Sequence, residues 1–198
     1  NPLTASLGVR FLPGTLVQPT KAYDDNLLVC SFTEEGVKVV TPFQGLWRQK
    51  YGITMPGAAA LSYETGNGFD VYPLLKTQDA GSWNELTTVN FMDEKAVLNP
   101  EIGEKEESFP TMLALTRTVG SREQRVFVMG DVDCISNAEL LMSRVGMRVN
   151  NFSLISGMFR WLSDGEYPIV LSGVPPVDTV LELNKDTVPY VRIAFTWG

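Results

Sequence analysis

The chain of 198 residues carries 23 acidic and 16 basic residues, which gives a net charge of −7, and 44% of its residues are hydrophobic. This composition is typical of one folded globular domain, and the acidity disfavours binding to nucleic acid or to anionic membranes, because both require clustered Lys and Arg. The absence of histidine excludes Ser-His-Asp and Cys-His catalytic triads and histidine-ligated zinc, whereas carboxylate, Lys and Tyr chemistry stays open.

Short apolar runs between turn residues predict strands in the first part of the chain, together with short helices. Residues 3–9 read as the end of a helix, and Pro42 suits the first turn of another, where its missing N–H does no harm. Ser82 can cap one helical turn, and Pro56 is expected to bend the strand that contains it. The predicted elements are strands at 27–32, 53–63, 69–76 and 112–119 and a helix at 42–50.

The segment 125–161 has the clearest pattern. Val126–Met129 is apolar at every position, which is typical of a central parallel strand that is covered on both faces. A helix is predicted over 137–145, with Ser136 or Asn137 as its N-cap. Strands mixed with helices, including one fully buried strand, predict a single layered α/β domain.

A second helix is predicted from about Asn151, which can cap it as Ser153 also can, to the stop signal at Asp164. Its apolar side chains recur at helical spacing and predict one buried face, formed by Phe152, Ile155, Phe159 and Leu162. Gly157 inside this helix costs about 1 kcal/mol against Ala, so we expect a neighbouring element to pack closely against it.

An acidic pair, Asp131 and Asp133, follows the strand at 126–129. Open α/β sheets bind ligands at the carboxyl ends of their strands, and two carboxylates at this spacing can share a magnesium ion. The pair resembles the first motif of haloacid-dehalogenase-like phosphatases, in which one carboxylate is the nucleophile and the other the acid/base. A magnesium-dependent phosphohydrolase that uses Asp131 and Asp133 is therefore the alternative function.

The structural interpretation of the acidic pair is stronger. An Asp at a strand end caps the backbone N–H groups that follow, and Ser136 and Asn137 supply more local hydrogen bonds. A dehalogenase-type enzyme also needs a downstream Lys and a second acidic pair, whereas Lys185 is the only Lys after Asp133 and no paired acids follow. We therefore expect the pair to position the turn or a ligand, with no catalysis.

Cys30 and Cys134 each follow an apolar run and are predicted to be small buried residues, although a single bridge between them stays open. Gly-rich phosphate loops are absent from the sequence. The four Trp and six Tyr residues can include a sugar-stacking surface, but Trp161, on its predicted helix, is expected to pack in the core.

The two ends of the chain suggest a piece of a longer protein. No run approaches the roughly 18 consecutive apolar residues that a membrane-spanning helix needs, and Asn1-Pro2-Leu3 is not the basic start of a signal peptide. The segment 188–197 is apolar apart from Arg192, and Trp197 suits a membrane interface. We expect a spanning helix after Gly198; the alternative is that 188–197 is an edge strand that closes the sheet.

The run RVFVMGDVDCISNAELLMSRVGMRVNNFSLISGMFRWLSDGEYPI, residues 125–169, resembles the gliding-motility-associated (GldG-type) auxiliary family of ABC transporters. The family pattern is an apolar strand, Gly-Asp-x-Asp, Ser-Asn, a short helix, a second helix that bears an Asn, and a closing Trp-Leu. The matching residues are Gly130, Asp131, Asp133, Ser136, Asn137, Asn151, Trp161 and Leu162. The segments 7–19 and 72–86 are also similar, and Thr77 falls in the family's Leu-Leu-x-Thr-Ser region.

The resemblance implies one flavodoxin-like or glutamine-amidotransferase-like α/β domain over residues 1–198, without that superfamily's catalytic residues and lacking its opening strand or strands here. It implies a non-enzymatic periplasmic domain of a cytoplasmic-membrane protein, which works with an ABC-2-type permease and an ATPase in substrate capture or assembly. No cofactor is expected, and a carbohydrate is the expected ligand. The candidate ligand-binding residues are Asp131, Asp133, Ser136, Asn137 and Thr77.

Overall fold

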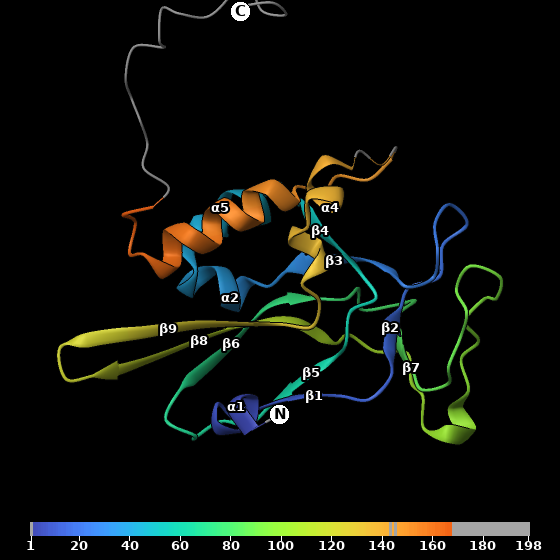
Figure 1. Ribbon diagram of the computed structural model, residues 1–198, viewed down its shortest axis with the longest axis horizontal. Coiled ribbons are helices and arrows are strands. Elements are labelled where there is room, and N and C mark those ends of the chain that lie inside the picture. Colours follow the sequence, from blue (N-terminus) through green and yellow to red (C-terminus); the bar gives the residue numbers. More distant parts are fainter. Residues whose placement is uncertain (1, 143, 145, 168–198) are drawn as a thin grey trace, which may run out of the picture. The chain divides into compact units, whose positions relative to one another are not determined.

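The computed structural model describes residues 2–142, 144 and 146–167 (Figure 1). Its centre is a curled five-stranded sheet with the strand order β4-β3-β6-β8-β9, and every neighbouring pair in it is antiparallel. The strands are β3 (Leu27–Phe32), β4 (Gly52–Pro56), β6 (Asp70–Lys76), β8 (Pro110–Val119) and β9 (Arg122–Met129). Two small antiparallel sheets pair β1 (Val9–Phe11) with β5 (Leu61–Tyr63) and β2 (Thr15–Val17) with β7 (Trp83–Glu85).

The helices are short apart from the last one. They are α1 (Pro2–Ser6), α2 (Glu34–Val39), η1 (Thr41–Phe43), α3 (Gln44–Arg48), η2 (Pro100–Ile102), η3 (Asp133–Ile135), α4 (Asn137–Leu141) and α5 (Asn151–Leu162). In Figure 1, α2, α4 and α5 lie above the central sheet, while α1, β1 and β5 lie below it. The sheet therefore separates a larger core under the helices from a smaller core against β5.

The predicted flavodoxin-like α/β fold is wrong. A flavodoxin-like domain has a parallel sheet built from strand–helix–strand crossovers, whereas all the ladders between the described strands are antiparallel. The described residues form a mostly antiparallel β structure with few helices. The prediction of a layered sheet that lacks its opening strand is therefore wrong as well.

Strand β9 explains the error. It pairs only with β8 among the described strands, so it is an edge strand and not a central one. Val126 and Val128 pack into the smaller core on one face, while Phe127 and Met129 pack against the larger core on the other. A strand that is apolar at every position is covered on both faces. An edge strand between two cores meets this condition as well as a central strand does.

Several sequence expectations are confirmed within this different fold. β3 has the predicted bounds, β6 and β8 fall at the predicted strands, and η1 followed by α3 occupies the helix predicted at 42–50. The strand predicted at 53–63 is divided into β4 and β5 beside Pro56, where a bend was expected. The helical turn predicted at Ser82 is wrong, because β7 pairs there with β2.

Helix α5 is present, but its buried face is not the predicted one. The side chains of Phe152 and Phe159 are 71% and 60% exposed, whereas Leu154 and Trp161 are buried. The helix carries a second apolar stripe, so periodicity alone could not orient it. Its N-cap is Asn150, whose side chain accepts the Ser153 N–H at 2.9 Å. The cap therefore lies one residue before Asn151 and three before Ser153, the two predicted caps.

Gly157 confirms the expected close packing. A Cβ at this position would lie 2.1 Å from a ring carbon of Phe43, so only glycine lets α5 approach η1 this closely. Two expectations, the strand or membrane-proximal segment at 188–197 and the spanning helix after Gly198, lie outside the described residues. In the part of the chain that the structure describes, no helix is long and apolar enough to cross a membrane.

Candidate functional site

The acidic pair lies where the chain leaves β9, and Asp131 is a cap. Its Oδ1 accepts the Asp133 N–H at 2.7 Å and its Oδ2 accepts the Cys134 N–H at 3.1 Å, which holds the start of η3. Burial raises the pKa of Asp131 above its usual value, and these two N–H groups act in the opposite direction. Both carboxylate oxygens are thus used by the turn itself.

The other predicted site residues do not converge with Asp131. Ser136 caps α4 by accepting the Glu139 N–H at 3.2 Å, and the side chains of Asp133 and Asn137 are exposed. Thr77 is buried after β6, where its hydroxyl accepts the Phe109 N–H at 2.9 Å. Thr77 has no hydrogen bond to the other four among the described residues, which also contain no group of three potential metal ligands.

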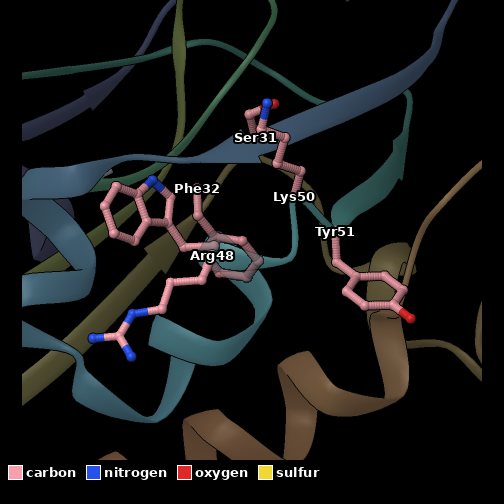
Figure 2. Close-up of a pocket in the computed structure, with 6 residues that line it drawn as sticks. Ser31, Phe32, Arg48, Lys50 and Tyr51 are labelled. Carbon is pink, nitrogen blue, oxygen red and sulfur yellow. The ribbon is translucent and has the colours of Figure 1, made fainter.

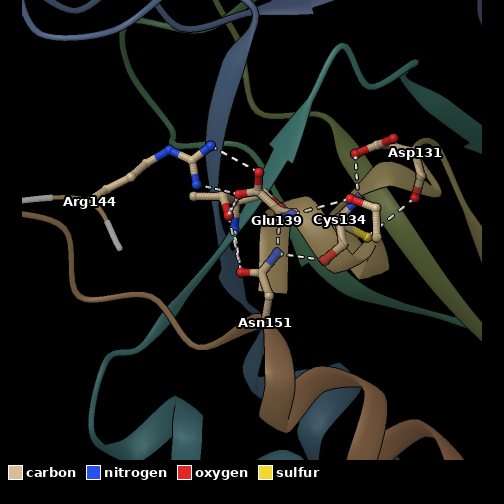
Figure 3. Close-up of polar contacts among 7 residues, drawn as sticks. Asp131, Cys134, Glu139, Arg144 and Asn151 are labelled. Atoms are coloured by element: carbon tan, nitrogen blue, oxygen red, sulfur yellow. Dashed lines mark hydrogen bonds and ion pairs between the residues drawn. The ribbon is translucent and has the colours of Figure 1, made fainter. Parts of the chain in front are cut away.

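A buried polar network, which we did not predict, lies beside this turn (Figure 3). Arg144 forks onto the Glu139 carboxylate, with one N–O distance of 2.9 Å, and the two side chains are 11% and 6% exposed. The Thr54 hydroxyl donates to the same carboxylate. Asn151 donates to the carbonyls of Thr54 at 2.9 Å and Cys134 at 2.8 Å. The network therefore joins α4 and α5 to β4.

Both cysteines are buried, as predicted, and they belong to the same core. They are free, which answers the question of a bridge that the sequence left open. Burial raises the pKa of Cys30 and of Cys134 to about 12. Because only the thiolate is a strong nucleophile, neither residue is suited to covalent catalysis near neutral pH.

A cleft beside α3 has a different character. Its volume is about 440 Å³. The six residues that line it are Ser31, Phe32, Trp47, Arg48, Lys50 and Tyr51 (Figure 2). In the view of Figure 2, the Phe32 ring lies between Arg48 and Tyr51, and Lys50 extends toward Ser31 on β3. We call this the α3 cleft. It combines aromatic rings with two cations, and no acidic residue lines it.

The cations of the α3 cleft have no ion-pair partner among the described residues. Lys50 also has a φ of +54°, in the left-handed region that favours glycine. It ends α3 in a Schellman motif, in which the Lys50 N–H donates to the Trp47 carbonyl at 3.0 Å and the Tyr51 N–H to the Leu46 carbonyl at 2.9 Å. A lysine therefore occupies a backbone position where glycine would be more stable.

A second pocket, also of about 440 Å³, lies between α3 and α5 and shares Tyr51 with the α3 cleft. We call it the α5 pocket. Most of its side chains are polar or basic, and they include Gln49, Asn150, Ser153, Ser156 and Arg160. The guanidinium of Arg148 lies 4.6 Å from the centre of the Tyr51 ring, a cation–π contact at the boundary.

The sequence contains only part of the signal for the α3 cleft and the α5 pocket. Trp47-Arg48-Gln49-Lys50-Tyr51 is the one run of five residues in which two aromatic residues enclose two cations. Its neighbours in space, Arg148 and Arg160, follow about a hundred residues later. The Arg148 carbonyl accepts the Gly52 N–H at 2.9 Å at the start of β4, and Arg160 comes from α5. The sequence had placed the candidate site at the Asp131 turn.

No family model, no curated protein and no solved structure matches this chain.

Proposed function

We propose that the chain is a non-enzymatic extracytoplasmic domain of an ABC transporter complex, which binds a glycan during substrate capture or assembly. The observation that carries the binding function is the α3 cleft, where aromatic rings and unpaired cations are open to a ligand. The association with an ABC-2-type permease and an ATPase, and the periplasmic location, are proposed from the resemblance of residues 125–169.

The contacts of Asp131 support binding over catalysis. A phosphohydrolase would need Asp131 free to attack phosphorus or to hold magnesium, yet both its oxygens accept backbone N–H groups. The buried Glu139 is held in the same way by Arg144 and Thr54. The carboxylates of Asp131 and Glu139 stabilise the turn, because their oxygens accept hydrogen bonds from groups inside the protein.

The rival phosphohydrolase is tested with magnesium and a generic phosphoester such as p-nitrophenyl phosphate. We expect no turnover, and we expect millimolar magnesium to leave the melting temperature unchanged, because a bound cation would raise it by mass action. Turnover that Asp131→Asn abolishes would overturn the non-enzymatic proposal.

The transporter association is tested with the full-length natural chain in its native membranes. Affinity purification after mild crosslinking should recover a permease and an ATPase of the ABC class. Recovery of neither subunit, from membranes in which the tagged chain is intact and abundant, contradicts the proposed association.

A further inference from the structure

We infer that the α3 cleft and the α5 pocket are two subsites for one anionic oligosaccharide, which passes over Tyr51. This inference rests on the proposed glycan-binding function and specifies the ligand's charge and length. It follows from three observations: the aromatic surface, the local excess of cations, and the side chain that the two pockets share.

The aromatic surface is held ready for a ring. Trp47 packs partly against the larger core, and Tyr51 is half-buried between the pockets, so neither ring has to be ordered by the ligand. The C–H face of a pyranose packs on the electron-rich face of an indole or phenol ring. Such rigid amphipathic rings lose little conformational entropy when they bind.

The local charge opposes the charge of the molecule. The chain as a whole carries −7, yet none of the residues that line either pocket is acidic, and Arg48, Lys50 and Arg160 line them. These three cations have no carboxylate partner among the described residues. A carboxylate, sulfate or phosphate on a sugar would supply the missing partner through charge-assisted hydrogen bonds.

The strained backbone of Lys50 points in the same direction. Left-handed backbone at a residue other than glycine is uncommon and is often associated with functional sites. A glycine there would complete the same helix end without strain but would remove the ammonium group from the cleft. Lysine at this position is consistent with a requirement for charge.

The shared Tyr51 sets the length of the ligand. Each pocket has about 440 Å³, within the range of small-molecule sites. The α3 cleft is mainly aromatic, whereas the α5 pocket offers amide and hydroxyl groups from Gln49, Asn150 and Ser153. One sugar can stack in the first while the next is held by hydrogen bonds in the second, so at least a disaccharide is required to occupy both.

The test is a glycan array that places each acidic oligosaccharide beside its neutral counterpart, for example trigalacturonate beside its methyl ester. We expect binding to acidic members, weaker binding to the corresponding monosaccharides, and loss of affinity as salt is raised. Lys50→Gly and Arg160→Ala should each weaken binding by about tenfold. Lys105→Ala, which removes an exposed charge outside both pockets, is the matched control and should bind normally.

Each outcome decides the inference. Equal binding of neutral and acidic glycans, normal binding by both pocket variants, or the absence of any bound acidic glycan overturns it. Lys50→Gly relieves left-handed backbone, so its thermal midpoint is measured with its affinity: a loss of binding without a fall in the midpoint is not caused by misfolding. Binding of neutral glycans alone leaves the proposed function standing, whereas acidic binding without recovery of transporter subunits leaves this inference standing and contradicts the association.

Discussion

The turn after β9 and the α3 cleft both contain charged side chains, but they differ in where those charges find partners. At the turn, Asp131 accepts two backbone N–H groups, and Glu139 is paired with Arg144 and Thr54. At the cleft, Arg48 and Lys50 have no carboxylate partner among the described residues. Asp131 and Glu139 are satisfied inside the protein, whereas the cations of the cleft are available to a ligand.

This difference separates structure from function more reliably than residue type does. A pair of aspartates at a strand end suggests chemistry in the sequence, but a carboxylate whose oxygens are occupied by backbone donors mainly stabilises the local fold. A cation beside half-buried aromatic rings suggests little in the sequence, yet it is free to meet a ligand. Variants at the turn should therefore alter stability, and variants at the cleft should alter binding.

The largest effect is expected from Glu139→Ala. Removing one partner of a buried ion pair costs about 3–5 kcal/mol, because Arg144 is then left buried without its carboxylate. The free energy of unfolding, measured by urea denaturation, checks this. In the double variant Glu139→Leu/Arg144→Met most of the lost stability should be recovered. If Glu139→Ala were as stable as the wild type, the network would not stabilise the fold.

Gly130→Ala should cost about 3 kcal/mol. A Cβ at Gly130 would lie 2.0 Å from the carbonyl oxygen of Ala59, and the backbone there is tied by the Ala59 N–H to the Gly130 carbonyl at 3.0 Å. Gly45 in α3 is the control, since no atom lies within 4 Å of a Cβ placed there. Gly45→Ala should be neutral or slightly stabilising, and equal effects of the two substitutions would contradict the close approach.

Alkaline pH should weaken the core next to the turn. Cys30 and Cys134 have a pKa of about 12 in the folded chain against an ordinary value of 9.0. As pH rises, the thiols therefore lose their protons first in the unfolded state. The protonated thiols contribute fully to the free energy of unfolding below pH 9.0, and this contribution falls as pH rises toward 12. By pH 10 the loss is on the order of 1 kcal/mol per thiol. The variant Cys30→Ala/Cys134→Ala should lack this component in a series of urea denaturations at increasing pH; an identical decline would contradict it.

The smallest expected effect has the opposite sign. Lys50→Gly should stabilise the fold by about 1 kcal/mol, because it relieves left-handed backbone at a helix end. A rise in the thermal midpoint measures this, and Arg48→Gly, inside α3, should lower the midpoint instead. A fall with Lys50→Gly would mean that the lysine side chain stabilises the fold and is not held there for a ligand.

The local features that the sequence predicted correctly depend on neighbouring residues. Ser136 caps α4 because its hydroxyl reaches the N–H three residues on, and Pro42 lies in the first turn of η1. Gly157 indicated a close contact before Phe43 was known to supply it. The buried pair of cysteines follows in the same way from the apolar runs before them.

Features that depend on long-range pairing were mispredicted. The apolar run 126–129 is equally compatible with a central parallel strand and with β9, an edge strand between two cores. The candidate site failed for a related reason. Thr77 and Asp131 follow β6 and β9, which lie on either side of β8 and end at the same edge of the sheet. Each side chain is nevertheless bonded to its own local backbone, and no hydrogen bond joins the two among the described residues. Tyr51 meets Arg148 because the chain before α5 pairs with Gly52, and it meets the α5 pocket because α5 packs beside α3. No local pattern encodes either contact.

The most direct test measures thermal midpoint and glycan affinity together for Lys50→Gly and Asp131→Ala. The ligand is the acidic oligosaccharide that binds most tightly on the array, and its affinity is measured by titration calorimetry. We expect Lys50→Gly to raise the midpoint and to weaken binding about tenfold. Asp131→Ala should cost about 1 kcal/mol of stability and leave the affinity unchanged. Binding lost in Asp131→Ala and retained in Lys50→Gly would place the site at the turn and contradict the account.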